Sequence, residues 1–316
     1  MSRVRGEVLG WFAARRVAPG RELALLRAAA MIPAPAQWRA FLGQLALWLG
    51  TVALAAAVIF FFAFNWDDLG RLAKFGLVEA AILAALLACW RLDLDGIAGK
   101  AVLTLMSLLV GALLALAGQI YQTGADTFEL FAYWAALILP WVLVGRFAPL
   151  WLIWLGLLNL ALFLYFSLGQ NGEAFVWALF ALNGLALILW EAARGIGLSW
   201  LRESWPPRLV GIGSTAAATG LIIWAIADGH GRSDFFATLA YLAWLAGLYV
   251  WYRSVRPDLF MLAVGLLSLT VSVAAFLSRH MLDSGGGAFL FIGLIVIGMS
   301  AAGAIWLKSV AAGQPE

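Results

Sequence analysis

The sequence predicts an all-α integral membrane protein with about ten transmembrane helices arranged as five outward hairpins. Three observations predict this fold class: an apolar composition, a series of runs long enough to cross a bilayer, and an unequal distribution of basic residues. Apolar residues make up 64% of the chain and charged residues 12%, compared with about 45–50% and 25% in soluble domains. Backbone polar groups in lipid must be satisfied within each element, and the alternation typical of a β-barrel is absent. The runs are therefore expected to be helices.

Residues 1–38 are predicted to form a cytoplasmic or interfacial helical segment. Apolar residues recur at helical spacing in two groups, around Phe12 and around Leu26, with Pro19-Gly20 between them. This pattern predicts a pair of short helices. Such a segment is too small for a core of its own, so we expect it to lie on the membrane surface, to pack on the ends of the spans, or to bind a protein partner.

The transmembrane domain is predicted over residues 39–310 and is followed by a cytoplasmic tail, residues 311–316. A membrane span needs about 20 mostly apolar residues. Tryptophans near the ends of the runs, such as Trp151, Trp190 and Trp251, are typical of an interfacial belt. The runs of sufficient length lie at residues 40–64, 74–91, 101–121, 129–145, 148–168, 174–192, 208–227, 234–252, 258–278 and 287–307.

Basic residues support this number of spans. With ten spans, sixteen of the 20 Lys and Arg residues lie on the side that carries both termini. A missed or additional span would remove this bias, and the positive-inside rule then predicts that both termini are cytoplasmic. The opposite side receives only Arg71, Lys74, Arg232 and Arg279.

A polar stretch at residues 118–129 interrupts about forty apolar residues and contains the first candidate ligand-binding side chains. Gln119 and Gln122 are three residues apart and can share a helical face at the outer end of the third span. Tyr121 lies between them, and Asp126 follows in the turn.

Glu79 is a further candidate because it lies about five residues inside the second span, where a carboxylate is costly and often functional. An ion pair with Lys74 is the structural alternative. If the first two hairpins pack together, Glu79 would join Asn65 and Asp67 of the first outer turn and the polar stretch in an outward-facing polar pocket. Such a pocket would suit a small polar solute or a lipid headgroup, although turn capping and interhelical hydrogen bonds would use the same residues.

Two segments carry a family resemblance: Asn65-Trp66-Asp67-Asp68 with Lys74, and Gly118-Gln119-Ile120-Tyr121-Gln122-Thr123-Gly124-Ala125-Asp126. With them, residues 5–145 resemble a bacterial family of multi-pass membrane proteins known as domain of unknown function number twenty-one fifty-seven. The resemblance implies a protein of the bacterial cytoplasmic (inner) membrane with a soluble N-terminal segment. It implies no reaction and no ligand.

Other polar residues favour structural interpretations. Asn159 and Asn183 lie near the centres of the fifth and sixth spans and are predicted to hydrogen-bond across helices. The two histidines, His230 and His280, are predicted to be exposed turn residues, so neither a metal site nor a cofactor is expected. Gly298 begins a small-xxx-small face that would suit a homodimer.

The sequence favours a protein that binds or translocates a small polar or amphipathic, lipid-linked molecule through the outward pocket. The alternative is a non-catalytic scaffold or accessory subunit of a bacterial envelope complex, with a protein partner at the N-terminal helices. A membrane enzyme acting on a lipid-linked substrate comes third, with Glu79 and Asp67 or Asp126 as acid and base. No catalytic motif supports the third hypothesis, and the basic residues indicate topology and membrane lipids, with no nucleic-acid partner.

Overall fold

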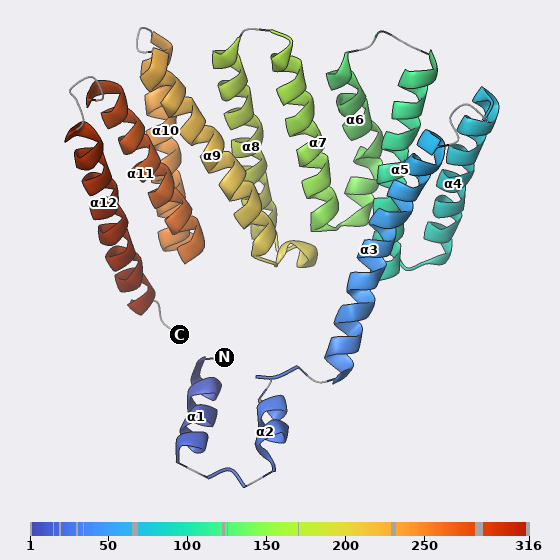
Figure 1. Cartoon of the computed structure of the whole chain (residues 1–316). Helices are drawn as coiled ribbons and strands as arrows, with labels where there is room; N and C mark the ends of the chain where they lie inside the picture. Colours follow the sequence, from blue (N-terminus) through green and yellow to red (C-terminus); the bar gives the residue numbers. More distant parts are fainter. Residues whose placement is uncertain are drawn as a thin grey trace. The chain divides into compact units, whose positions relative to one another are not determined.

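The computed structural model describes residues 2–313, apart from residues 15, 19, 30, 34, 65–68, 122, 123, 125, 170, 229–231 and 282–286. Every element in this described part of the chain is a helix (Figure 1). The chain divides into two compact units, Met1–Leu113 and Leu114–Glu316. Each unit is considered by itself.

The first unit begins with two short helices, α1 (Ser2–Ala13) and α2 (Glu22–Ala28), which confirms the predicted helix pair. Neither helix is long enough to cross a bilayer. They are followed by two long apolar helices, α3 (Pro35–Phe64) and α4 (Arg71–Arg91), and by the first part of α5 (Ile97–Tyr121).

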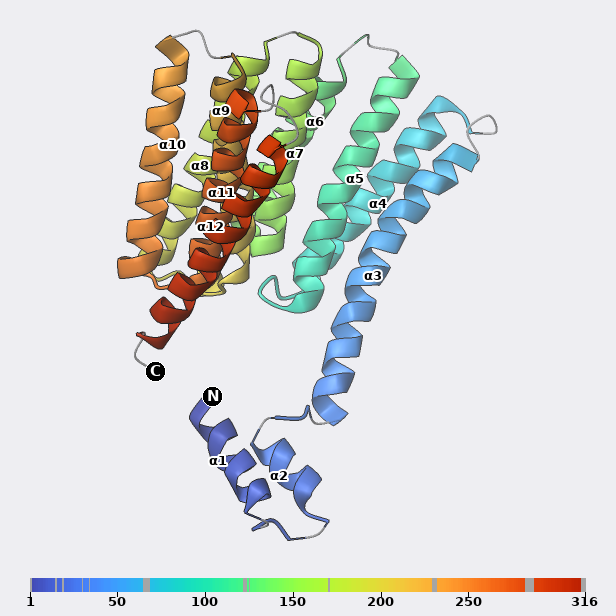
Figure 2. The ribbon, with the colours of Figure 1, turned by 60° about the vertical axis from the view of Figure 1, so that its left-hand side comes forward.

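The second unit contains the end of α5 and seven further long helices. Neighbours along the chain run antiparallel, as Figure 1 and Figure 2 show from two directions. Within this unit, α9 is central because it packs against α7, α8, α10 and α11. The helices are α6 (Thr127–Gly145), α7 (Ala148–Ser167), α8 (Gly172–Gly195), α9 (Trp205–Asp228), α10 (Arg232–Val250), α11 (Leu259–Met281) and α12 (Gly287–Ala312).

Ten of the described helices are long and apolar enough to cross a membrane. Each of them overlaps one of the ten runs found in the sequence, which confirms the number and the approximate positions of the spans. The hairpin arrangement and the side of the membrane on which each terminus lies stay predictions.

Small residues allow α9 to approach its neighbours closely. Ser214 and Ala218 are fully buried. A Cβ atom added at Gly211 would lie 2.1 Å from the Cε atom of Met261 on α11, so a larger residue does not fit there without a shift. This is the close packing that small residues permit between membrane helices. The run from Gly211 to Thr215, the one stretch in which the sequence allows unwinding, is helical throughout.

Hydroxyl groups join α9, α10 and α11 near the middle of these spans. Ser268 Oγ lies 2.7 Å from Thr219 Oγ1 and 3.1 Å from the Tyr241 hydroxyl oxygen. The Ser272 hydroxyl donates to the Tyr241 oxygen at 2.8 Å. Hydrogen bonds between membrane helices contribute about 0.6 kcal/mol each on average, so this network fixes helix register more than it adds stability.

Several tryptophans near the span ends pack inward. Trp190 is only 9% exposed, and Trp151 and Trp251 pack against the same core cluster, which also contains Leu187 and Met261. The prediction of an interfacial side chain is therefore wrong for Trp190. Its aromatic area is buried against other helices because this end of the unit is filled by large rings.

Candidate functional site

Glu79, the first predicted site residue, lies on α4 in the first unit, and its side chain is exposed. Among the described residues, none forms an ion pair or hydrogen bond with the Glu79 carboxylate. Lys74, five residues earlier on the same helix, is 6% exposed and has a partner. The ion pair with Lys74, which is the structural alternative for Glu79, is not formed among the described residues.

The predicted residues of the polar stretch lie in the second unit. Gln119 is exposed and Tyr121 is 64% exposed, both in the last turn of α5, and Asp126 is exposed directly before α6. Asn65, Asp67 and Gln122 lie outside the described residues. Glu79 lies in the first unit and the polar stretch in the second. A pocket shared by them therefore stays a prediction.

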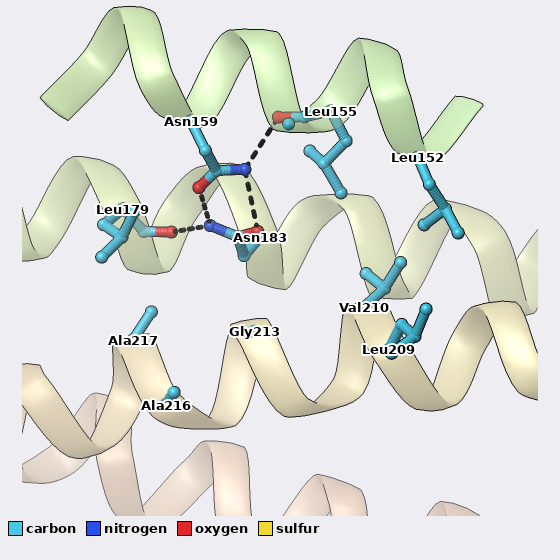
Figure 3. Close-up of a pocket in the computed structure, with 11 residues that line it drawn as sticks. Leu152, Leu155, Asn159, Leu179, Asn183, Leu209, Val210, Gly213, Ala216 and Ala217 are labelled. Atoms are coloured by element: carbon cyan, nitrogen blue, oxygen red, sulfur yellow. Dashed lines mark hydrogen bonds between the residues drawn. The ribbon is translucent and has the colours of Figure 1, made fainter. Parts of the chain in front are cut away.

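Asn159 on α7 and Asn183 on α8 form a reciprocal amide pair (Figure 3). Asn183 Nδ2 donates to Asn159 Oδ1 at 2.7 Å, and Asn159 Nδ2 donates to Asn183 Oδ1 at 3.2 Å. Each amide also donates to a backbone carbonyl one turn earlier, that of Leu155 or Leu179. The predicted hydrogen bond across these helices is confirmed.

The amide pair forms part of the wall of a cavity of about 500 Å³ between α7, α8 and α9. The other residues around it are glycines and aliphatic residues, including Gly156, Gly213 and Val210 (Figure 3). Both hydrogens of each amide are already donated, so the cavity offers a ligand only the remaining lone pairs of two carbonyl oxygens. This chemistry is typical of interhelical pairing and gives little basis for ligand recognition.

Glu191, near the C-terminal end of α8, is 5% exposed and has four polar partners. Its Oε1 atom lies 2.9 Å from Nη1 of Arg194 and accepts a hydrogen bond from the Tyr252 hydroxyl at 3.1 Å. Its Oε2 atom lies 3.3 Å from Nη1 of Arg256 and accepts a hydrogen bond from Nε1 of Trp251 at 3.4 Å. A buried carboxylate is tolerated only when it is paired and hydrogen-bonded in this way.

An irregular backbone segment brings two of these partners to the carboxylate. After Val250, α10 continues as a π-helical segment, η2 (Trp251–Val255), in which the Arg256 amide donates to the Trp251 carbonyl at 2.9 Å. Successive residues of an α-helix do not share a face, yet Trp251 and Tyr252 both reach Glu191. Short π-helical segments are frequent at functional sites.

A third ion pair, between Arg208 and Asp258, fixes the connection between η2 and α11. Arg208 on α9 donates to both oxygens of Asp258, at 2.9 and 3.2 Å. Asp258 Oδ1 also accepts hydrogen bonds from the backbone amides of Phe260 and Met261 at the start of α11. Because Asp258 is held by two helices, the position of Arg256 two residues earlier is constrained as well.

A groove of about 630 Å³ lies between α8 and α10, and Glu191, Trp251 and Tyr252 are the polar residues near one end of its lining. Its walls include the buried side chains of Leu187 and Leu248 and the exposed small residues Ala243 and Gly247. An added Cβ atom at Gly247 would meet no atom within 4 Å. Because Ala243 has only a methyl side chain and Gly247 has none, the α8–α10 groove is open to the surface that a membrane would cover.

Glu191 is not among the site residues that the sequence predicts. The predicted apolar run of the sixth span, residues 174–192, has Glu191 at its end, where charged residues are common. The helix instead continues to Gly195. A carboxylate one turn before Arg194 was the available signal, and its distant partners Tyr252 and Arg256 are visible only in the folded chain.

Comparison with known proteins adds a family match for the N-terminal part. Residues 10–151 match the family described as Predicted membrane protein (DUF2157). The DUF2157 match confirms the predicted resemblance, and it includes Glu79, Gln119 and Asp126. The amide pair and the Glu191 cluster lie beyond it. No curated protein and no solved structure matches the chain.

Proposed function

We propose that this membrane protein binds an amphipathic molecule within the bilayer, with the apolar part of that molecule in the α8–α10 groove. The single observation that supports this proposal is the groove itself. It is apolar, has a volume of about 630 Å³, and has Glu191, Trp251 and Tyr252 near one end. Its volume lies within the range of about 300–1,000 Å³ that is common for ligand sites, which are also mostly apolar with a few polar groups.

The groove matches an occupant that places one apolar chain in it and has a polar end. Ile188 is 57% exposed and forms part of the rim, while Tyr252 is 3% exposed and lies at the polar end. A molecule already dissolved in the membrane would enter sideways without crossing water. Lipid tails are as apolar as leucine, so the apolar wall contributes little selectivity, and recognition depends on the polar end.

Filling the groove tests this proposal. Gly247→Leu places a side chain in the groove, and Gly293→Leu on α12 is the matched control because an added Cβ there also meets no atom within 4 Å. The full chain is reconstituted in nanodiscs with a lipid that carries a photoreactive group on its acyl chain, and labelled peptides of α8 and α10 are quantified. We expect labelling to fall severalfold in Gly247→Leu only. Equal labelling in both variants would refute the proposal.

The outward polar pocket is a second candidate, favoured by one observation. The Glu79 carboxylate lies on an apolar helix, is exposed, and has no described partner. A carboxylate in that position is costly unless a ligand, water or another chain satisfies it. We propose that Glu79 in the first unit, and Gln119, Tyr121 and Asp126 in the second, bind a small polar solute or a headgroup.

A further inference from the structure

We infer that the occupant of the α8–α10 groove is a phospholipid with an anionic headgroup, bound by Arg194 and Arg256. This inference rests on the proposed function. The supporting observations are the charge, the exposure and the hydrogen-bonding capacity of Arg194 and Arg256, which contact Glu191 at the polar end of the groove.

The polar end has an excess of positive charge. Glu191 pairs with two arginines, Arg194 and Arg256, so the cluster carries one uncompensated positive charge. The neighbouring pair of Arg208 and Asp258 is neutral. On this end of the unit the residues from 191 to 258 include five arginines and three carboxylates, namely Arg194, Arg202, Arg208, Arg253, Arg256, Glu191, Glu203 and Asp258.

The positive groups are more accessible than the negative one. The side chain of Arg256 is 29% exposed and that of Arg194 is 16% exposed, whereas the Glu191 side chain is 6% exposed. Glu191 lines the groove and the two arginines contact it from outside that lining, so a headgroup that extends past the end of the groove meets the more exposed guanidinium groups. A guanidinium has five N–H donors; Arg194 donates one to Glu191, and Arg256 pairs with Glu191 through Nη1 at 3.3 Å, so further donors remain for phosphate oxygens.

A cationic headgroup does not fit this arrangement. Both oxygens of Glu191 already have two partners each, which come from Arg194, Tyr252, Arg256 and Trp251. The carboxylate thus holds the two arginines in place and has no free lone pair directed at a ligand. Basic pockets between membrane helices are a known mode of anionic lipid recognition.

The expected selectivity is modest. One uncompensated positive charge near the membrane surface attracts an anionic lipid by about 1 kcal/mol, which corresponds to roughly fivefold over a neutral lipid. The test uses the full chain in nanodiscs that contain photoreactive phosphatidylglycerol or photoreactive phosphatidylcholine with identical acyl chains. We expect about fivefold more labelling of α8 and α10 by phosphatidylglycerol.

Three variants distinguish a bound headgroup from a general effect of positive charge. Arg256→Gln should reduce the labelling ratio to near one, while Glu191 keeps its pair with Arg194 and the protein stays folded. Arg253→Gln removes the same charge three residues earlier, within η2, but Arg253 does not contact Glu191 among the described residues, so the ratio should be retained. Arg256→Lys keeps the charge without the planar donors and should give an intermediate ratio.

Each result identifies which idea fails. Suppose that phosphatidylglycerol and phosphatidylcholine label the protein equally and that Gly247→Leu loses the labelling by both lipids. This result would overturn the headgroup assignment and leave the proposed function intact. Labelling that Gly247→Leu does not change would overturn the proposed function. If millimolar inorganic phosphate removes the preference for phosphatidylglycerol, the arginines bind free phosphate, and the lipid assignment is wrong.

Discussion

Replacing Glu191 by glutamine tests the contacts that define the polar end of the groove. The substitution keeps the shape of the side chain and removes its charge. One amide oxygen can still accept from Tyr252 and Arg194, but the new NH2 group faces the donors of Arg256 and Trp251. Two of the four contacts are therefore lost, and the contact with Arg194 becomes a neutral acceptor interaction.

The cost follows from the distances and exposures. A hydrogen bond to a charged group contributes about 1.5–3 kcal/mol and a neutral one about 1 kcal/mol. The lost contacts of Arg256 and Trp251 are long, at 3.3 and 3.4 Å, and the Arg256 side chain is 29% exposed, so water can replace part of the interaction. Adding the weakened pair with Arg194, we expect Glu191→Gln to lower the free energy of unfolding by about 2–3 kcal/mol.

Thermal unfolding in detergent measures this change. The matched control is Glu173→Gln in the first turn of the same helix, where only the interaction of a carboxylate with the helix dipole is lost, about 0.3–1 kcal/mol. We expect Glu191→Gln to have a clearly lower Tm than Glu173→Gln. If the two variants unfold at the same temperature, the buried cluster does not hold α8 and η2 together, and the reasoning fails.

Two further predictions concern the amide pair and the outward pocket. Asn183→Leu leaves the Asn159 amide without its partner and should lower the free energy of unfolding by about 1–2 kcal/mol, seen as a lower Tm in detergent; an unchanged Tm would contradict a stabilising pair. Glu79→Gln and Gln119→Leu should each abolish thermal stabilisation by ethanolamine, a soluble headgroup analogue with a cationic amino group, in a protein that remains folded. Equal stabilisation of both variants and the unmodified protein would exclude these residues as a site.

The spans were predictable because their signals are local. Run length and composition determined all ten, and the interhelical bond of Asn159 and Asn183 followed from two amides at the centres of apolar runs, where polar groups need a partner. The helical continuity of α9 was harder to predict. The run from Gly211 to Thr215 has low helix propensity, yet close packing against Met261 favours the helix.

The Glu191 cluster was not predictable because its parts are far apart in sequence. Arg256 and Tyr252 lie more than sixty residues after Glu191, and only the packing of α8 and α10 around α9 brings them together. The π-helical turn that directs Trp251 and Tyr252 to one carboxylate has no simple sequence signal. The groove likewise depends on residues with little or no side chain, such as Gly247. The residues around Gly247 are known only from the fold.

An experimental structure of the full chain in nanodiscs containing phosphatidylglycerol would show whether the α8–α10 groove holds a lipid. We expect elongated density in the groove beside Gly247, with a headgroup within hydrogen-bonding distance of Arg194 or Arg256. A groove that is empty, or that is closed by the side chains of α8 and α10, would contradict this expectation.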